Sequence, residues 1–146
     1  MTPPFVFDTS ALFAHCLEES GYRIVEDILD QHRDQTYISA ITWLEFQARL
    51  EEIISSADSR QDILACYAEL FANPLPVTKE VVTAALAVRK QTGRRLPNAD
   101  AIIAATAMEN KATLVHRDAH LSEIPAQLVK QLVLPPKGRN LSAPRP

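Results

Sequence analysis

Four acidic residues lie where a carboxylate needs a partner, and their types and spacing indicate metal chemistry. Asp8 and Asp118 each follow a short apolar segment, and Asp100 opens a long apolar helical segment. Glu45 lies inside the apolar stretch ITWLEF, where a lone acid needs a counter-charge. A divalent cation from solvent would supply that charge, and hard carboxylate oxygens suit Mg²⁺ or Mn²⁺.

Each of these acids also has a purely structural interpretation. Asp8 could cap the first helix, and Asp100 could lie in a first helical turn, where the helix dipole favours an anion. Thr42 and Glu45 have the spacing of a capping box. Helix capping explains any one acid, but the joint placement of all four favours a shared site.

The elements that must position these acids alternate along the chain. Short apolar segments predict strands, and amphipathic segments predict helices. Strands are expected at 5–7, 37–39, 75–77, 113–116 and 129–134, and helices at about 10–19, 24–29, 40–54, 60–71, 79–91 and 98–110. Ser59 and Asn98 are expected to cap helices, and Gly93 and Asn110 to end them in left-handed conformations. The alternation predicts an α/β sandwich around a largely parallel sheet.

In an open parallel sheet, ligands bind beyond the carboxyl ends of the strands. Asp8 and Asp118 both lie just past such ends, so we expect them at the same edge of the sheet. Asp100 opens the helix before the strand that leads to Asp118, and it can project toward that edge. Three acids are therefore expected to converge, with Glu45 as the fourth candidate.

Composition argues against several classes of function. The formal net charge of −3 is unlike a broad nucleic-acid-binding surface, and the three glycines form neither a GxGxxG turn nor a P-loop. Cys16 and Cys66 form no CxxC pair and are interpreted as core residues. Neither a signal peptide nor a membrane-spanning segment is found, which predicts a cytoplasmic protein. One domain is expected over 1–134, followed by a flexible proline-rich tail over 135–146.

Three stretches carry a family resemblance: FVFDTSAL near the start, ITWLEF in the middle, and RRLPNADAIIAATAMENKATLVHRDAHL toward the end. They resemble the PIN domain, specifically the VapC-type ribonuclease toxins of bacterial toxin–antitoxin pairs, over about residues 5–134. The resemblance implies a three-layer α/β/α sandwich with a central, mainly parallel sheet. It puts the family's acidic site on the four acids that spacing selects, namely Asp8, Glu45, Asp100 and Asp118.

The activity that the resemblance implies is hydrolysis of RNA phosphodiester bonds by a metal-dependent endoribonuclease, acting as the toxin of a toxin–antitoxin pair. All four acids would be catalytic, and Asp8, Asp100 and Asp118 would hold Mg²⁺ or Mn²⁺. The implied partners are an RNA substrate, a small antitoxin protein and a second copy of the chain, with no membrane. The antitoxin's tail would lie between the early helices and bring a basic side chain near the acids. Apolar residues on those helices are interface candidates unless they are core, namely Leu12, Phe13, Ile53 and Ile54.

Four neighbouring residues are candidates for substrate binding or for supporting the acids: Thr9, Ser10, His116 and Arg117. Thr9 and Ser10 could bond a ligand or cap the helix, and Arg117 could hold a flanking phosphate. His116 stands where the family usually has threonine or serine. Strand periodicity would point His116 to the same side as Asp118. It could then bind metal, hydrogen-bond Asp118 or pack at the strand end, and we expect the second.

Two alternative functions stay open from the sequence. One is an inactive PIN-like protein-interaction module, although four intact acids count against it. The other is a phosphatase of haloacid-dehalogenase type with Asp8 as nucleophile. That family requires a second aspartate two positions on, where this chain has Ser10.

Overall fold

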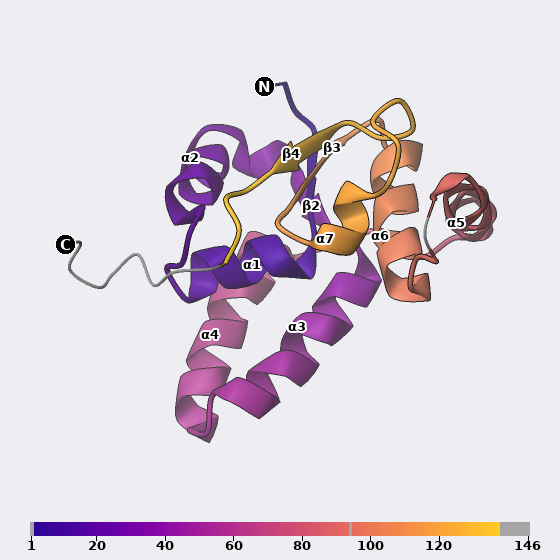
Figure 1. Ribbon diagram of the computed structural model, residues 1–146. Helices are drawn as coiled ribbons and strands as arrows, with labels where there is room; N and C mark the ends of the chain where they lie inside the picture. Colours follow the sequence, from indigo (N-terminus) through magenta and orange to yellow (C-terminus); the bar gives the residue numbers. More distant parts are fainter. Residues whose placement is uncertain (1, 94, 138–146) are drawn as a thin grey trace.

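Figure 1 presents the computed structural model, which describes residues 2–93 and 95–137. Four strands form a single sheet in the order β2-β1-β3-β4, and every neighbouring pair runs parallel. The strands are β1 (Phe5–Phe7), β2 (Thr36–Ile38), β3 (Thr113–His116) and β4 (Gln131–Val133). The helices are α1 (Thr9–Cys16), α2 (Tyr22–His32), η1 (Arg33–Gln35), α3 (Ala40–Ile53), α4 (Ala57–Leu70), α5 (Lys79–Gln91), α6 (Asn98–Glu109) and α7 (Ala119–Ser122).

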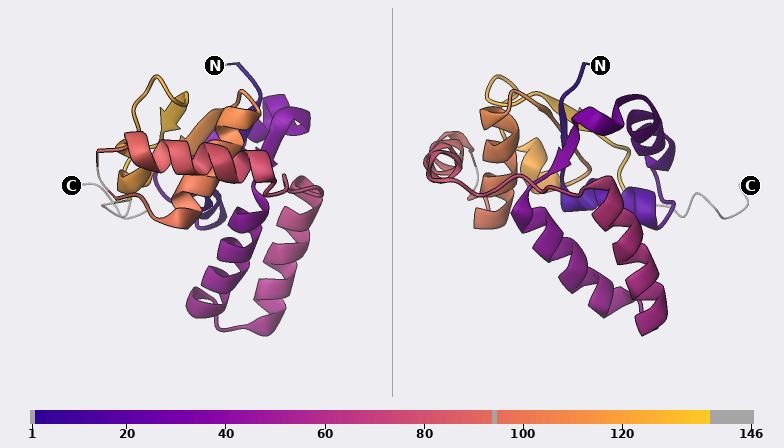
Figure 2. Two further views of the ribbon diagram at one scale, coloured as in Figure 1. Left: turned by 90° about the vertical axis from the view of Figure 1, so that its right-hand side faces the viewer. Right: turned by 180° about the vertical axis from the view of Figure 1, so that it is seen from behind.

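Helices cover both faces of the sheet, so the predicted three-layer sandwich is confirmed. Successive side chains of a strand point to opposite faces. Phe5 and Phe7 accordingly pack into a core with α1 to α4, while Val6 packs into a second core with α5, α6 and α7. All three side chains are fully buried, which explains why β1 is an unbroken apolar run. Figure 2 shows α3 and α4 lying side by side and extending beyond the sandwich.

The strand expected at 75–77 is wrong. Only Leu75 joins the edge of the sheet, as an isolated parallel bridge to Ser39. Its amide donates to the Ile38 carbonyl oxygen at 2.8 Å, and its carbonyl accepts from the Ala40 amide at 2.8 Å. The pairing stops after one residue because its partner, Ser39, is the N-cap of α3, and the chain turns into that helix at Ala40.

Three expected helix caps are also wrong. Helix α4 begins three residues before the expected Arg60, because the Ser56 hydroxyl accepts from the Ser59 amide at 3.2 Å. Asn98 lies inside α6, and Pro97 occupies the N-cap position. At the other end of α6, Asn110 has φ −103° and Lys111 takes the left-handed conformation at φ 50°.

The left-handed glycine of the described chain is Gly21, at φ 93°, and the expected Gly93 is not in that region. A Cβ on Gly21 would stand 3.0 Å from the Cβ of Leu134, so the segment after β4 packs directly on the α1–α2 connection. This segment continues to Lys137, whose ammonium lies 3.5 Å from Oε2 of Glu19. Residues 138–146 of the expected tail lie outside the described residues. Among the helices that the structure describes, none is long and apolar enough to cross a membrane.

Candidate active site

The four acids predicted from the sequence line one cleft of about 960 Å³. Asp8 follows β1 and Asp118 follows β3, so these two carboxylates lie at the carboxyl edge of neighbouring parallel strands. Asp100 comes from the first turn of α6, and Glu45 from the second turn of α3. The fold thus brings together residues from four separate parts of the chain, as the strand-end argument predicts.

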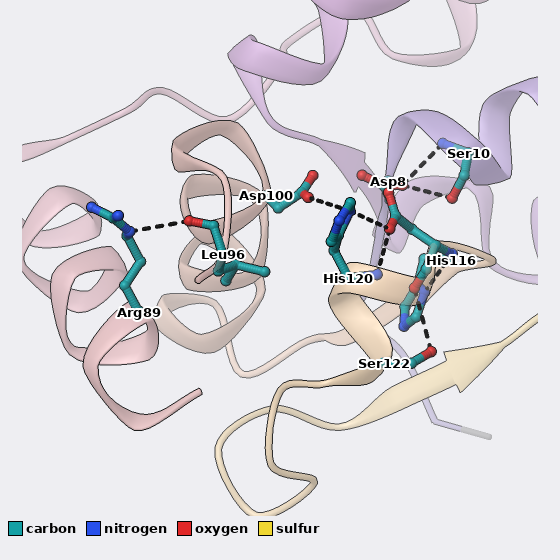
Figure 3. Close-up of polar contacts among 9 residues, drawn as sticks. Asp8, Ser10, Arg89, Leu96, Asp100, His116, His120 and Ser122 are labelled. Carbon is teal, nitrogen blue, oxygen red and sulfur yellow. Dashed lines mark hydrogen bonds and ion pairs between the residues drawn. The ribbon is translucent and has the colours of Figure 1, made fainter. Parts of the chain in front are cut away.

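Two of the acids are helix caps as well as cleft residues. Oδ2 of Asp8 accepts from the Ser10 amide at 3.0 Å and from the Ser10 hydroxyl at 2.6 Å (Figure 3). Oδ1 of Asp118 accepts from the His120 amide at 2.7 Å. Each of these carboxylates has its other oxygen outside these bonds. Capping therefore orients Asp8 and Asp118, and it does not replace a role in the cleft.

The structural alternative for Glu45, a capping box with Thr42, is not formed. Ser39 caps α3 instead, accepting from the Ile41 amide at 3.1 Å. Oε1 of Glu45 accepts from the Thr9 hydroxyl of α1 at 2.7 Å. The Thr42 hydroxyl is buried and has no hydrogen-bond partner among the described residues. Glu45 is thus held toward the cleft from the neighbouring helix.

The electrostatics of the cleft are those of crowded anions. Burial raises the pKa of the Asp8 carboxyl, although the two hydrogen bonds from Ser10 oppose that change. Burial, followed by the charges of Asp118, Asp8 and Glu45, raises the pKa of Asp100 to about 7. A cation bound among the four carboxylates would relieve this repulsion. The oxygen donors and the unbalanced negative charge therefore fit a divalent metal ion.

The position of His116 differs from the expected one. Its side chain is fully buried and does not line the cleft. Nδ1 accepts from the Asp118 backbone amide at 3.0 Å, and Nε2 bonds Oε1 of Gln131 at 2.8 Å. Gln131 in turn donates to the Ile124 carbonyl oxygen at 3.1 Å. His116 thus contacts the backbone of Asp118, while the expected hydrogen bond to its carboxylate is not formed.

Arg117 lines the cleft, and its side chain is held by contacts within the fold. The side chain is 5% exposed, and its guanidinium forms an ion pair with Glu19 and donates to the Ser20 carbonyl oxygen at 3.4 Å. The Arg117 amide donates to the Ser10 hydroxyl at 3.0 Å. Ser10 therefore links Asp8 to the loop that leads to Asp118.

Among the cleft residues that the sequence analysis does not single out, His120 and Arg49 have side chains close to the acids or to the apolar wall. His120 places Nδ1 3.4 Å from Oδ1 of Asp118 and 3.8 Å from Oδ2 of Asp100. Arg49 lies one helical turn after Glu45, with its guanidinium carbon 6.0 Å from the centroid of the Phe13 ring. The sequence signal for His120 is its position two residues after Asp118, and the signal for Arg49 is its position four residues after Glu45.

Comparisons with known proteins agree with this geometry. A family model for the PIN domain matches residues 5–127. Comparison with curated proteins gives no significant match. Three solved structures illustrate the likeness in fold. VapBC2 from Rickettsia felis, bound to a DNA fragment from its promoter, is 18% identical at a TM-score of 0.71, covering 90% of this chain and 98% of that one.

The other two have similar coverage. FitAcB from Neisseria gonorrhoeae is 23% identical at a TM-score of 0.68, covering 87% of this chain and 95% of that one. A toxin–antitoxin complex from Klebsiella pneumoniae is 26% identical at a TM-score of 0.57, covering 77% and 85%. The matched residues include the strand ends and helix starts that carry all four acids. The chain therefore belongs to the PIN domain family.

Proposed function

We propose that this protein is a metal-dependent endoribonuclease that hydrolyses RNA phosphodiester bonds. The observation that carries the proposal is the convergence of four carboxylates in one cleft, where three of them help to raise the pKa of Asp100 to about 7. Membership of the PIN family supports a nuclease, because PIN domains are generally nucleases. The same membership leaves the haloacid-dehalogenase alternative without support.

In this proposal Asp8, Asp100 and Asp118 hold Mg²⁺ or Mn²⁺, and Glu45 completes the catalytic set. The bound cation would polarise the phosphodiester, activate a water and stabilise the leaving oxygen. With a pKa of about 7, the Asp100 carboxyl is about half protonated at neutral pH before the cation binds, and binding would release this proton to solvent. Ser10, Thr9 and the amide of His120 hold three of the carboxylates in fixed orientations.

We further infer that the nuclease is the toxin of a toxin–antitoxin pair. The solved structures similar to this fold include toxin–antitoxin complexes, and the cleft is lined by both apolar and acidic side chains. Apolar side chains of α1 and α3 line one part of it, and the acids line the other. An antitoxin segment with an apolar anchor and a basic side chain would match both parts. A toxin that cleaves RNA acts in the cytoplasm, which is where we place it.

The proposed homodimer requires an interface other than the one first expected. Leu12 and Phe13 are buried in the core, so they are excluded from a surface. Ile54 packs partly against that core, and Ile53 is 42% exposed in the cleft wall. Larger apolar exposure occurs elsewhere, on Leu44, Val82 and Leu86. A second copy that covers these three residues is the form of dimer that we propose.

The test is cleavage of RNA by the purified protein with Mg²⁺ or Mn²⁺, and with EDTA. Asp8→Asn and Asp100→Asn should each abolish cleavage while the fold, followed by circular dichroism, is kept. Asp62→Asn, an exposed residue of α4, is the matched control and should cleave like the parent. A parent protein that cleaves no RNA with either metal would favour the inactive interaction module. Cleavage that persists in EDTA would contradict the metal requirement.

A further inference from the structure

His120 lies at the solvent side of the acid cleft, on the short helix α7 that follows Asp118. Its side chain is 58% exposed, and Figure 3 shows the imidazole reaching toward Asp100. A ring nitrogen of His120 and one carboxylate oxygen from each of Asp100 and Asp118 all lie within 4.8 Å of one another. The three residues therefore offer a mixed nitrogen and oxygen donor set.

We propose that His120 is a direct ligand of the divalent cation, together with Asp100 and Asp118, so that the site takes a transition metal such as Mn²⁺ in preference to Mg²⁺. This inference rests on the proposed function, because it concerns the metal of the same cleft. It adds to that function a ligand of different chemistry from the four carboxylates. It also assigns a cation preference.

The distances support direct ligation after a small adjustment. Adjacent ligands of an octahedral ion lie about 3 Å apart when the metal–ligand bonds are about 2.1 Å. Without a cation, Nδ1 of His120 lies 3.4 Å from Oδ1 of Asp118 and 3.8 Å from Oδ2 of Asp100. Rotation of the exposed imidazole and of the carboxylates can close these gaps of about 0.4 and 0.8 Å.

The local backbone keeps His120 in place for this role. The His120 amide donates to Oδ1 of Asp118 at 2.7 Å, which fixes the histidine relative to the carboxylate. At the end of α7, the amides of Ser122 and Glu123 bond the carbonyl oxygens of Asp118 and His120, at 3.1 and 3.2 Å. Leu121, between them, is fully buried and anchors the helix in the core. The imidazole thus leaves a rigid turn at the rim of the cleft.

The chemical consequence is a change in selectivity. Carboxylates and water suit Mg²⁺ and Mn²⁺ alike, but an imidazole nitrogen favours transition metals and is a poor ligand for Mg²⁺. Removing the imidazole should therefore weaken Mn²⁺ binding more than Mg²⁺ binding. If the imidazole only formed an ion pair with the two aspartates, its removal would free their carboxylates. The affinity for Mn²⁺ and the affinity for Mg²⁺ would then both rise.

The experiment measures Mn²⁺ directly, independently of RNA cleavage. Electron spin-echo spectra of the Mn²⁺-loaded parent should contain a ¹⁴N coupling from coordinated imidazole, and His120→Gln should lose it. Calorimetric titration should give Mn²⁺ affinity at least about tenfold lower in His120→Gln, with Mg²⁺ affinity changed by less than about threefold. His120→Asp should recover Mn²⁺ binding without the ¹⁴N coupling. The control is His32→Gln, at the end of α2, where the centroid of the His32 ring lies 5.6 Å from that of Phe5 in β1. This variant should keep the coupling.

Each outcome separates this inference from the proposed function. Mn²⁺ that binds the parent without ¹⁴N coupling, or a coupling that persists in His120→Gln, overturns the assignment of His120 and leaves the nuclease standing. A parent that shows the coupling, loses it in His120→Gln and cleaves no RNA supports the ligand and overturns the nuclease. Equal loss of Mg²⁺ and Mn²⁺ affinity in His120→Gln overturns the cation preference.

Discussion

At the scale of single residues, Asp8 and Asp118 each cap a helix with one carboxylate oxygen and line the cleft. Asp8 and Asp118 are predictable because strand ends and helix caps are local features. His116 is mispredicted because β3 ends at that residue, so the two-residue alternation of a strand does not extend to Asp118. Its ring turns to Gln131, which a neighbouring strand supplies. No local pattern contains that contact.

The raised pKa of Asp100 predicts how stability depends on pH in the metal-free protein. The carboxyl ordinarily has a pKa of 3.8 and has one of about 7 in the fold. Between these values the folded state retains a proton that the unfolded state has lost, so the free energy of unfolding falls as pH rises. Asp100→Asn does not titrate. In urea denaturation with EDTA, this variant should gain about 1–2 kcal/mol on the parent between pH 5 and pH 8. If the difference in free energy of unfolding between variant and parent stayed constant across that range, the pKa of Asp100 would not be raised in the folded protein.

Of the two arginines that line the cleft, Arg49 is the one that we expect to bind a phosphate of RNA. Among the described residues Arg49 forms no ion pair, whereas Arg117 is buried against Glu19. Arg49→Gln should therefore weaken binding of single-stranded RNA about three- to tenfold and reduce the salt dependence by about 0.7 in log–log slope. Fluorescence anisotropy in EDTA measures both quantities. Arg23→Gln, an exposed arginine of α2, should leave both unchanged. An Arg49→Gln variant that binds like the parent would exclude a phosphate contact at this position.

At the scale of elements, periodicity predicts helices better than their ends. The α5 bounds of 79–91 are confirmed, because an amphipathic pattern and a threonine cap agree there. The cap of α4 is mispredicted because Ser55, Ser56 and Ser59 all stand near the helix start, and Ser56 is the one whose hydroxyl accepts from an amide. The cap of α6 is mispredicted because Pro97 takes the N-cap position without a side-chain hydrogen bond. The strand expected at 75–77 does not form because its partner ends at Ser39, where the chain turns into α3.

A partly buried chain of hydrogen bonds joins α4 to α1 and α2. Burial raises the pKa of the Tyr67 hydroxyl, which lies 2.5 Å from Nδ1 of His15. Nε2 of His15 bonds Glu26 of α2 at 2.7 Å, and the pKa of Glu26 is lowered chiefly by this hydrogen bond. One histidine of α1 thereby joins α2 and α4. Because α3 and α4 lie side by side, this contact also supports the helix that carries Glu45.

Tyr67→Phe removes the hydroxyl and leaves Nδ1 of His15 without its partner. The free energy of unfolding should fall by about 1–2 kcal/mol, as expected for an unsatisfied polar group at a mostly buried site. Urea denaturation measures this loss. Tyr37→Phe is the matched control, because its exposed hydroxyl bonds the Asp34 carbonyl oxygen at 3.3 Å, and it should change stability by less than about 0.5 kcal/mol. Equal effects of the two substitutions would contradict a role for the His15 contact.

At the scale of the whole molecule, the candidate site is a junction of distant parts. Its acids come from the ends of β1 and β3 and from the starts of α3 and α6. The sheet order β2-β1-β3-β4 brings the first and third strands together, although more than 100 residues separate Asp8 from Asp118. The parallel fold class is predictable from alternating patterns, but strand order is a non-local property.

Because the acids belong to separate elements, a cation that binds them all should stabilise the entire fold. Ligand binding to the native state alone adds about 2.7 kcal/mol at one hundred times the dissociation constant. For a chain of this size, that gain corresponds to a rise in Tm of about 5–10 °C. Thermal scans should show this rise when Mn²⁺ replaces EDTA. In EDTA at pH 8, Asp100→Asn should have a higher Tm than the parent. Mn²⁺ should raise the Tm of this variant much less than that of the parent. With Mn²⁺ the parent should therefore have the higher Tm. The Asp62→Asn control should follow the parent in both buffers. If Mn²⁺ raises the Tm of Asp100→Asn as much as that of the parent, the stabilising cation binds outside the acid cleft.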